Sequence, residues 1–118
     1  MSIKIFGLSQ CNTVKKARQW LNDNNIVAEF VDFKKTPPSQ RDLEFWLSQI
    51  PKESLINRKG TTWRNLNPAE QQTALSCDRA AIELMMTQPS IIKRPVLTYK
   101  NQITIGFNPE HYQKFLSV

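Results

Sequence analysis

The sequence has few of the residues that build disulfide frameworks and metal centres. It contains two cysteines, Cys11 and Cys77, and one histidine, His111, in 118 residues. Two cysteines are too few for the framework of a small disulfide-rich domain, and they leave a metal ion without its usual ligand clusters. We therefore expect neither a disulfide framework nor a metal site. Because His111 falls in an expected C-terminal helix, we interpret it as a surface residue.

Long apolar segments are also missing. No run approaches membrane-spanning length, and the N-terminal residues Met1-Ser2-Ile3-Lys4 do not lead into the apolar region of a signal peptide. We therefore expect a cytoplasmic protein without membrane contact, and we take it to be a monomer. A length of 118 residues suffices for one domain with its own core.

Acidic residues are the minority among the charged side chains. Sixteen Lys and Arg residues against ten Asp and Glu residues give a net charge of +6 and a pI of about 9.6. Such a surplus can indicate nucleic-acid binding. Here the cations are dispersed, without a long basic tract or an aromatic stacking motif. We interpret the surplus as favouring solubility and attraction of small anions, and we rank nucleic-acid binding third among the functional hypotheses.

One cysteine lies in a pattern typical of a reactive thiol. Residues 3–6 predict a short strand before Cys11, and apolar residues at helical spacing predict a helix after it. At a helix N-terminus, unpaired amide groups and aligned peptide dipoles favour a negative charge. Lys15 and Lys16 add positive charge, and Thr13 adds a hydroxyl. A buried structural cysteine is the alternative, but the polar and basic neighbours favour a reactive thiol.

Strand-like segments lie near both ends of the chain. Residues 26–33 predict a second strand after the first helix. Residues 95–99 and 102–105 predict a tight hairpin, and Asn108 begins a last helix. This order of β-α-β and then β-β-α predicts an α/β protein with a thioredoxin-like fold and a mixed four-stranded sheet.

The expected domain organisation follows from the position of these strands. We expect a single domain over residues 1–118. Its thioredoxin-like core would comprise about residues 1–36 and 92–118, and a helical insertion would occupy about residues 37–91.

Local signals divide the expected insertion into short helices. Ser39 and Asn67 each predict a helix start, and residues 57–65 predict an irregular loop. Ser76 is a candidate cap for the next helix, which contains Cys77 near its start. We interpret Cys77 as a partly buried spacer because no cation precedes it and an aspartate follows it.

Three sequence blocks occur in the order and spacing of a known family. They are Cys11–Leu21, Leu55–Arg58 with Gly60–Arg64, and Ile91–Val96 with Gly106-Phe107. Together they resemble the arsenate reductase (ArsC)/Spx family and are most similar to its single-cysteine YffB-like branch. The resemblance covers nearly the whole chain.

The resemblance implies a role for each residue in the first block. Cys11 matches the nucleophile of the family. Thr13 and Lys15 match a C-x-T-x-R/K pattern that helps hold an oxyanion, and Asn12 lies within this pattern. These residues are therefore candidates for binding an oxyanion or glutathione.

The later blocks imply further anion-binding residues, and the chain departs from the family pattern at two positions, one of them in the first block. Arg94 matches an oxyanion-binding arginine, Pro95 after it is expected to be cis, and Arg58 falls within one residue of a second such arginine. Phe107 stands in the region where arsenate reductases carry another arginine, and a lost charge-assisted hydrogen bond weakens binding by about 1.5–3 kcal/mol. Arsenate is therefore a less favoured substrate. Val14 replaces the second cysteine of Spx regulators, which excludes a local disulfide switch.

The leading hypothesis is a glutathione-dependent thiol oxidoreductase. The thiolate of Cys11 would attack an oxyanion or a disulfide, and glutathione would resolve the adduct. Glutathione would thus be a co-substrate, with glutaredoxin as a further partner and no bound cofactor. The alternative is a Spx-like transcriptional regulator that binds RNA polymerase without enzymatic turnover.

Overall fold

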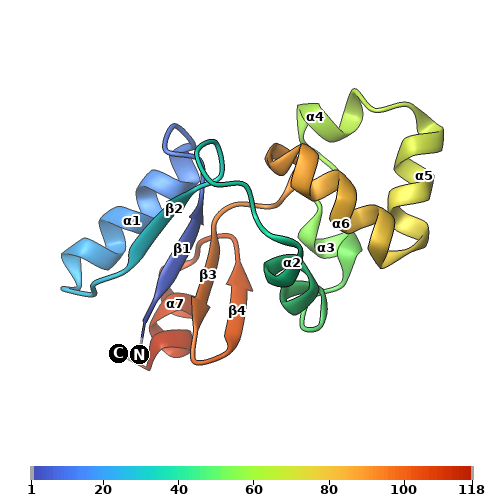
Figure 1. Ribbon diagram of the computed structural model, residues 1–118. Coiled ribbons are helices and arrows are strands. Elements are labelled where there is room, and N and C mark those ends of the chain that lie inside the picture. The colour runs from blue at the N-terminus through green and yellow to red at the C-terminus, as the bar shows by residue number, and fades with distance from the viewer. Residues whose placement is uncertain (1, 118) are drawn as a thin grey trace. The chain divides into compact units, whose positions relative to one another are not determined.

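The computed structural model describes residues 2–117 and divides the chain into two compact units. Unit 1 comprises Met1–Lys35 and Arg94–Val118, and unit 2 comprises Thr36–Lys93. Unit 1 contains the sheet, whereas unit 2 is built from helices (Figure 1). The description of residues 1–118 as one domain stays a prediction. In the part of the chain that is described, no helix is long and apolar enough to cross a membrane.

Unit 1 contains a mixed four-stranded sheet in the order β2-β1-β3-β4. The strands are β1 (Lys4–Gly7), β2 (Glu29–Asp32), β3 (Val96–Tyr99) and β4 (Gln102–Ile105). Strand β1 pairs in parallel with β2 and antiparallel with β3, and β3 pairs antiparallel with β4. The predicted α/β class and thioredoxin-like sheet are confirmed.

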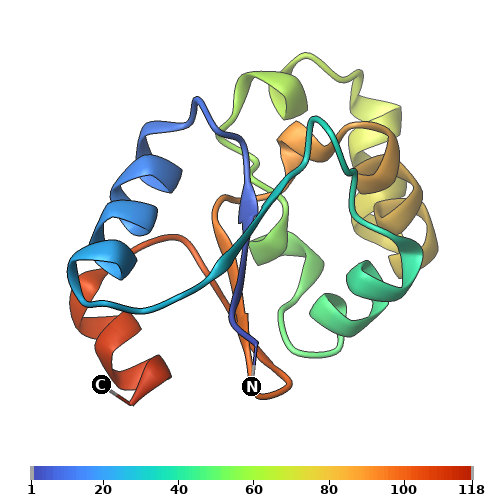
Figure 2. The same ribbon diagram turned by 60° about the vertical axis from the view of Figure 1, so that its left-hand side comes forward.

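Two helices cover one face of this sheet. Helix α1 (Asn12–Asp23) and helix α7 (Pro109–Leu116) lie on the same side of the strands (Figure 2). Their apolar side chains meet those of β1 and β3 in a buried cluster made of Ile5, Ala17, Leu21, Leu97, Tyr112 and Leu116. Apolar positions at helical spacing in α1 thus became the core-facing side of the helix.

The hairpin was predicted correctly, but the second strand is shorter than expected. Lys100 and Asn101 have φ values of 51° and 59°, which is the geometry of a tight two-residue hairpin turn. Residues 26–28 of the expected strand 26–33 are not paired in the sheet. The N–H of Ile26 instead donates to the carbonyl of Leu21 at the end of α1, which delays the start of β2.

Unit 2 consists of short helices. They are α2 (Gln40–Leu47), α3 (Lys52–Leu55), α4 (Thr61–Arg64), α5 (Pro68–Ser76), α6 (Asp78–Thr87) and the 3-10 helix η1 (Pro89–Ile91). Two predicted caps are confirmed, because Ser39 accepts from the N–H of Asp42 at 3.1 Å and Asn67 accepts from the N–H of Glu70 at 2.8 Å.

Three expectations for unit 2 were wrong. Residues 57–65 are not entirely irregular, since they include helix α4. Trp63 of α4 is buried, and its carbonyl accepts a hydrogen bond from the Gln71 side chain at 2.8 Å. The cap of α6 is Cys77 rather than Ser76: the Cys77 sulfur accepts from the N–H of Ala80 at 3.4 Å. Cys77 is also exposed, not partly buried.

Candidate active site

Cys11 lies at the junction between β1 and α1, as the sequence predicts. Its N–H donates to the carbonyl of Leu8 at 3.1 Å, which closes a turn after the strand. Its carbonyl accepts the first helical hydrogen bond from Lys15 at 3.0 Å, so Cys11 is the N-cap residue of α1. The residue is half-buried. The thiol is therefore accessible yet held at the positive end of a helix.

Gly7 brings the helix close to the strand. A Cβ atom at Gly7 would lie 2.6 Å from Cγ2 of Val14, a distance that no real contact allows. Val14 is fully buried and cannot move away without disturbing the core. Glycine at this position therefore lets the first turn of α1, and Cys11 with it, approach the end of β1.

The surroundings of Cys11 favour its thiolate. Burial alone would raise the pKa of Cys11, but interactions with the N–H of Val14, the side chain of Arg94 and the N–H of Thr13 outweigh it, and the pKa is lowered. The charge of Arg94 acts in the same direction. The N–H groups of Thr13 and Val14 interact with the Cys11 sulfur without forming a cap hydrogen bond of standard geometry. No acidic residue in the first turn opposes them.

The backbone at Pro95, next to Arg94, is held by two successive hydrogen bonds from the residues that follow it in the C-terminal part of the chain. The Arg94–Pro95 peptide bond is cis, as expected from the family resemblance. The carbonyl of Pro95 accepts from the N–H of Gly106 at 2.9 Å, and the carbonyl of Gly106 accepts from the Tyr112 hydroxyl at 2.9 Å. Gly106 has a φ of 78°, which favours glycine. Helix α7 thus fixes the backbone that carries Arg94.

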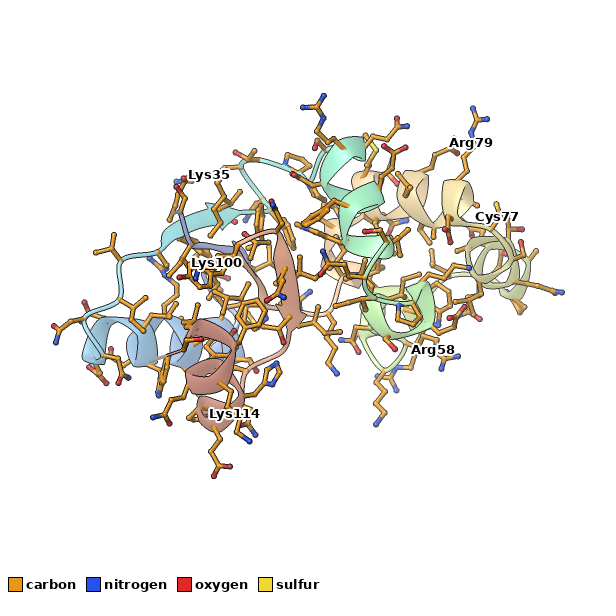
Figure 3. All side chains as sticks on the ribbon, turned by 90° about the horizontal axis from the view of Figure 1, so that it is seen from below. Lys35, Arg58, Cys77, Arg79, Lys100 and Lys114 are labelled. Carbon is orange, nitrogen blue, oxygen red and sulfur yellow. The ribbon has the colours of Figure 1, made fainter. Side chains whose placement is uncertain are left out.

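The other predicted site residues occupy different places. Asn12, Thr13 and Lys15 are exposed on the first turn of α1, next to the thiol in sequence. Arg58 belongs to unit 2 and is exposed in the segment between α3 and α4 (Figure 3). Its part in a site with Cys11 stays a prediction.

Phe107 has a structural role where the sequence suggested a lost anion contact. Its ring meets that of Tyr112 edge-on, with centroids 5.0 Å apart. Phe107 therefore packs against the core of unit 1.

Among residues 2–117, no group of three or more His, Cys, Asp and Glu side chains could hold a metal ion.

Sequence reasoning did not find the roles of Tyr112 and Gly106. The sequence predicts a last helix that contains Tyr112, but helical spacing does not reveal a hydroxyl contact to a carbonyl six residues away. Gly106 was part of the family motif, but nothing in one sequence showed which carbonyl its N–H would meet. The bond from Gly106 to Pro95 continues the register of the β3–β4 hairpin, whereas the bond from Tyr112 to Gly106 depends on how α7 packs on the sheet.

Comparison with known proteins gives a consistent family assignment. The model of the ArsC family matches residues 6–115. A solved structure named YFFB superposes with a TM-score of 0.89 at 36% identity, covering 96% of this chain and 97% of that one. The solution structure of an arsenate reductase (ArsC) related protein from Brucella melitensis gives a TM-score of 0.75 at 39% identity and covers 100% of this chain and 97% of that one.

Regulators also occur among the relatives. The global transcriptional regulator Spx of Streptococcus mutans is 26% identical over 116 residues, which covers 97% of this chain and 82% of that protein. Similarity therefore extends to proteins named for two different functions, and the site chemistry has to decide between them.

Proposed function

Because this chain belongs to the ArsC family, we propose that it is a glutathione-dependent thiol oxidoreductase with Cys11 as its nucleophile. The observation that carries the proposal is the position of the half-buried Cys11 thiol at a helix N-terminus beside Arg94. Burial raises the pKa of the thiol, but the first-turn amides and the Arg94 side chain outweigh burial and lower it. A thiolate is the attacking species in thiol–disulfide exchange.

With a disulfide substrate, two exchanges complete a cycle. The Cys11 thiolate attacks the glutathione sulfur of a mixed disulfide between glutathione and another thiol, which forms a Cys11–glutathione disulfide and releases the other thiol as its thiolate. A reduced glutathione then attacks the glutathionyl sulfur, which restores the Cys11 thiolate and forms oxidised glutathione. An external thiol is needed because position 14, one turn along, is the buried Val14 and carries no second sulfur.

With an oxyanion substrate, Cys11 and glutathione share a two-electron reduction. Each thiol supplies one electron, one oxygen of the substrate leaves as water, and the two sulfurs end as a Cys11–glutathione disulfide. A second reduced glutathione cleaves this disulfide, which restores the Cys11 thiolate and forms oxidised glutathione. Arg94 supplies a planar cation for the oxyanion or for a glutathione carboxylate. The exposed side chains of Asn12, Thr13 and Lys15 add donors on the first turn of α1, and Arg58 is a further candidate.

The test is modification by oxidised glutathione. Reduced protein incubated with oxidised glutathione should gain a single glutathionyl group on Cys11, detected by intact mass and located by peptide mapping. Cys11→Ser should gain none. Cys77→Ser should react like the unchanged protein, which makes it the matched control.

Two results would count against the proposal. One is modification that falls mainly on Cys77. The other is a Cys11 adduct that reduced glutathione cannot release, because the cycle then stops after its first exchange.

A second function, a Spx-like regulator that binds RNA polymerase, is supported by the similarity to the Streptococcus mutans Spx protein. The buried Val14 weighs against a redox switch of the C-x-x-C kind in such a regulator. Co-purification with RNA polymerase, compared between the unchanged protein and Cys11→Ser, tests this alternative. Stable binding by both forms, together with no glutathione turnover, would favour the regulator.

A further inference from the structure

Beside α1 in unit 1 runs a groove whose described lining residues include no acidic side chain. It has a volume of about 850 Å³. Its charged lining residues are Lys15 and Arg18, and its apolar lining includes Ile26 and Val27 of the segment between α1 and β2. Val27 is 90% exposed, an unusual state for a valine in a folded unit. The groove thus combines positive charge with exposed apolar surface.

The groove begins one helical turn after Cys11, at Lys15, whose N–H donates to the Cys11 carbonyl. Lys15, Arg18 and Asn22 line the groove and follow Cys11 at steps of 4, 3 and 4 residues. At 100° per residue, these positions fall within about 60° of one another around the helix. Lys15, Arg18 and Asn22 therefore form a continuous stripe that starts one turn after Cys11 and reaches the α1–β2 segment.

Arg18 is held in place along this stripe. Its guanidinium carbon lies 4.0 Å from the centroid of the Phe30 ring on β2. A cation stacked on an aromatic ring keeps its N–H groups directed outward at the ring edge. Arg18 therefore presents its N–H donors to a carboxylate along this stripe.

We propose that this groove binds an extended, acidic, cysteine-containing segment of a partner protein and presents its disulfide to Cys11. The inference rests on the proposed thiol chemistry and names its substrate class. The helix from Cys11 to Asn22 rises about 16 Å, which matches about five residues of extended peptide. A tripeptide such as glutathione spans about 10 Å and would end near Arg18, leaving the α1–β2 segment uncovered.

The reaction at the end of the groove is glutathione removal from the partner. The partner cysteine carries glutathione as a mixed disulfide. The Cys11 thiolate attacks the glutathione sulfur, so the bond between the two original sulfurs breaks and the partner cysteine leaves as a thiolate. Cys11 then carries the glutathione, and reduced glutathione releases it as described above. No oxidant beyond the substrate disulfide is needed.

The experiment uses two peptides of seven residues with a central cysteine joined to glutathione. One peptide has glutamate flanks and the other lysine flanks. Transfer of glutathione from each peptide is followed by mass spectrometry at low ionic strength. We expect the acidic peptide to react about tenfold faster with the unchanged protein. Arg18→Glu should abolish or reverse this preference.

Lys16→Glu is the matched control. Lys16 is exposed and lies on the same turn of α1 as Arg18, so its replacement by Glu changes the net charge by the same amount. Lys16 does not line the groove, and its position around the helix is at least about 100° away from the stripe. This variant should keep the preference. An equal loss in both variants would mean that net charge, not the groove, discriminates, and equal rates for the two peptides on the unchanged protein would overturn the inference.

A binding measurement separates this inference from the proposed function. Fluorescein-labelled versions of the two peptides, with serine in place of cysteine, are titrated with the Cys11→Ser protein. Tighter binding of the acidic peptide, lost in Cys11→Ser with Arg18→Glu, supports the groove even if Cys11 proves unreactive. Equal binding of both peptides overturns it, whatever the reactivity of Cys11.

Discussion

Two cysteines cap helices in this protein, and their neighbours give them different chemistry. Cys11 is half-buried, has the Arg94 side chain beside it and has no acidic residue in the following helical turn. Cys77 is exposed at the start of α6, where Asp78 follows it (Figure 3). A helix N-terminus is common to both, so the side chains around each sulfur decide which one serves as a nucleophile.

The first prediction concerns the pH dependence of Cys11. Alkylation by iodoacetamide follows the thiolate, so its rate should rise with pH through a midpoint below the ordinary pKa of a free cysteine. Arg94→Gln removes the positive charge and should move the midpoint upward. Lys114→Gln, which removes one charge from the exposed side of α7, should leave it in place. An unchanged midpoint in Arg94→Gln would remove Arg94 from the site.

The second prediction concerns Cys77. Its sulfur accepts a hydrogen bond from the N–H of Ala80, and serine is a better N-cap than cysteine. Cys77→Ser should therefore leave the free energy of unfolding unchanged or slightly higher, whereas Cys77→Ala should lower it by up to about 1 kcal/mol. Urea titration of both variants measures the difference. Equal stability of the two would mean that the sulfur contributes nothing as a cap.

At the scale of helices and strands, local chemistry predicted the elements that carry their own signals. Ser39, Asn67 and Asn108 each accept a hydrogen bond from the N–H three residues later, as N-cap residues do. The hairpin at Lys100-Asn101 was also predicted from local sequence, because two strand-like segments flank a turn of two residues. The one-turn helix α4 was missed because it depends on burial of Trp63 and on a contact from α5, which no local pattern reveals.

In the candidate site, too, local sequence patterns predicted some features, and others depend on contacts between distant residues. The position of Cys11 followed from a strand, a polar turn and a helical pattern in adjacent residues. The link from Tyr112 through Gly106 to Pro95 joins segments that are separate in the sequence. Such a link could not be predicted, since it requires the packing of α7 on the sheet. The family resemblance, not periodicity, pointed to Arg94.

The third prediction tests this link. Tyr112→Phe removes one hydroxyl and leaves the buried ring in place, so the Gly106 carbonyl loses its donor. We expect a loss of about 1–2 kcal/mol in the free energy of unfolding. Reactivity of Cys11 should also fall, because the backbone that carries Arg94 is less firmly held.

Tyr99→Phe is the control for Tyr112→Phe, since Tyr99 lies on β3 in the same unit and is only partly buried. Its loss of stability should be smaller. If Tyr112→Phe is destabilised but keeps the alkylation midpoint of Cys11 unchanged, the link is structural and does not position Arg94.

At the scale of the whole molecule, the excess of positive charge bears on which substrates arrive at the thiol. The chain carries a net charge of +6, and its cations are spread over both units. The electric field of such a net charge raises the rate at which oppositely charged ligands associate, even where the individual cations do not contact the ligand. Glutathione, with two carboxylates and one amine, is negatively charged at neutral pH.

The last prediction is therefore a dependence on salt that differs between substrates. Raising the ionic strength from 0.01 M to 1 M shortens the screening length from about 30 Å to about 3 Å. The rate of Cys11 modification by oxidised glutathione should fall by about tenfold or more over this range. The rate with hydroxyethyl disulfide, which is uncharged, should change little. A matching fall with both reagents would show that salt acts on the thiolate, by weakening its interaction with Arg94, rather than on the approach of the substrate. A flat rate with oxidised glutathione would show that the positive charge of the molecule has no part in attracting it.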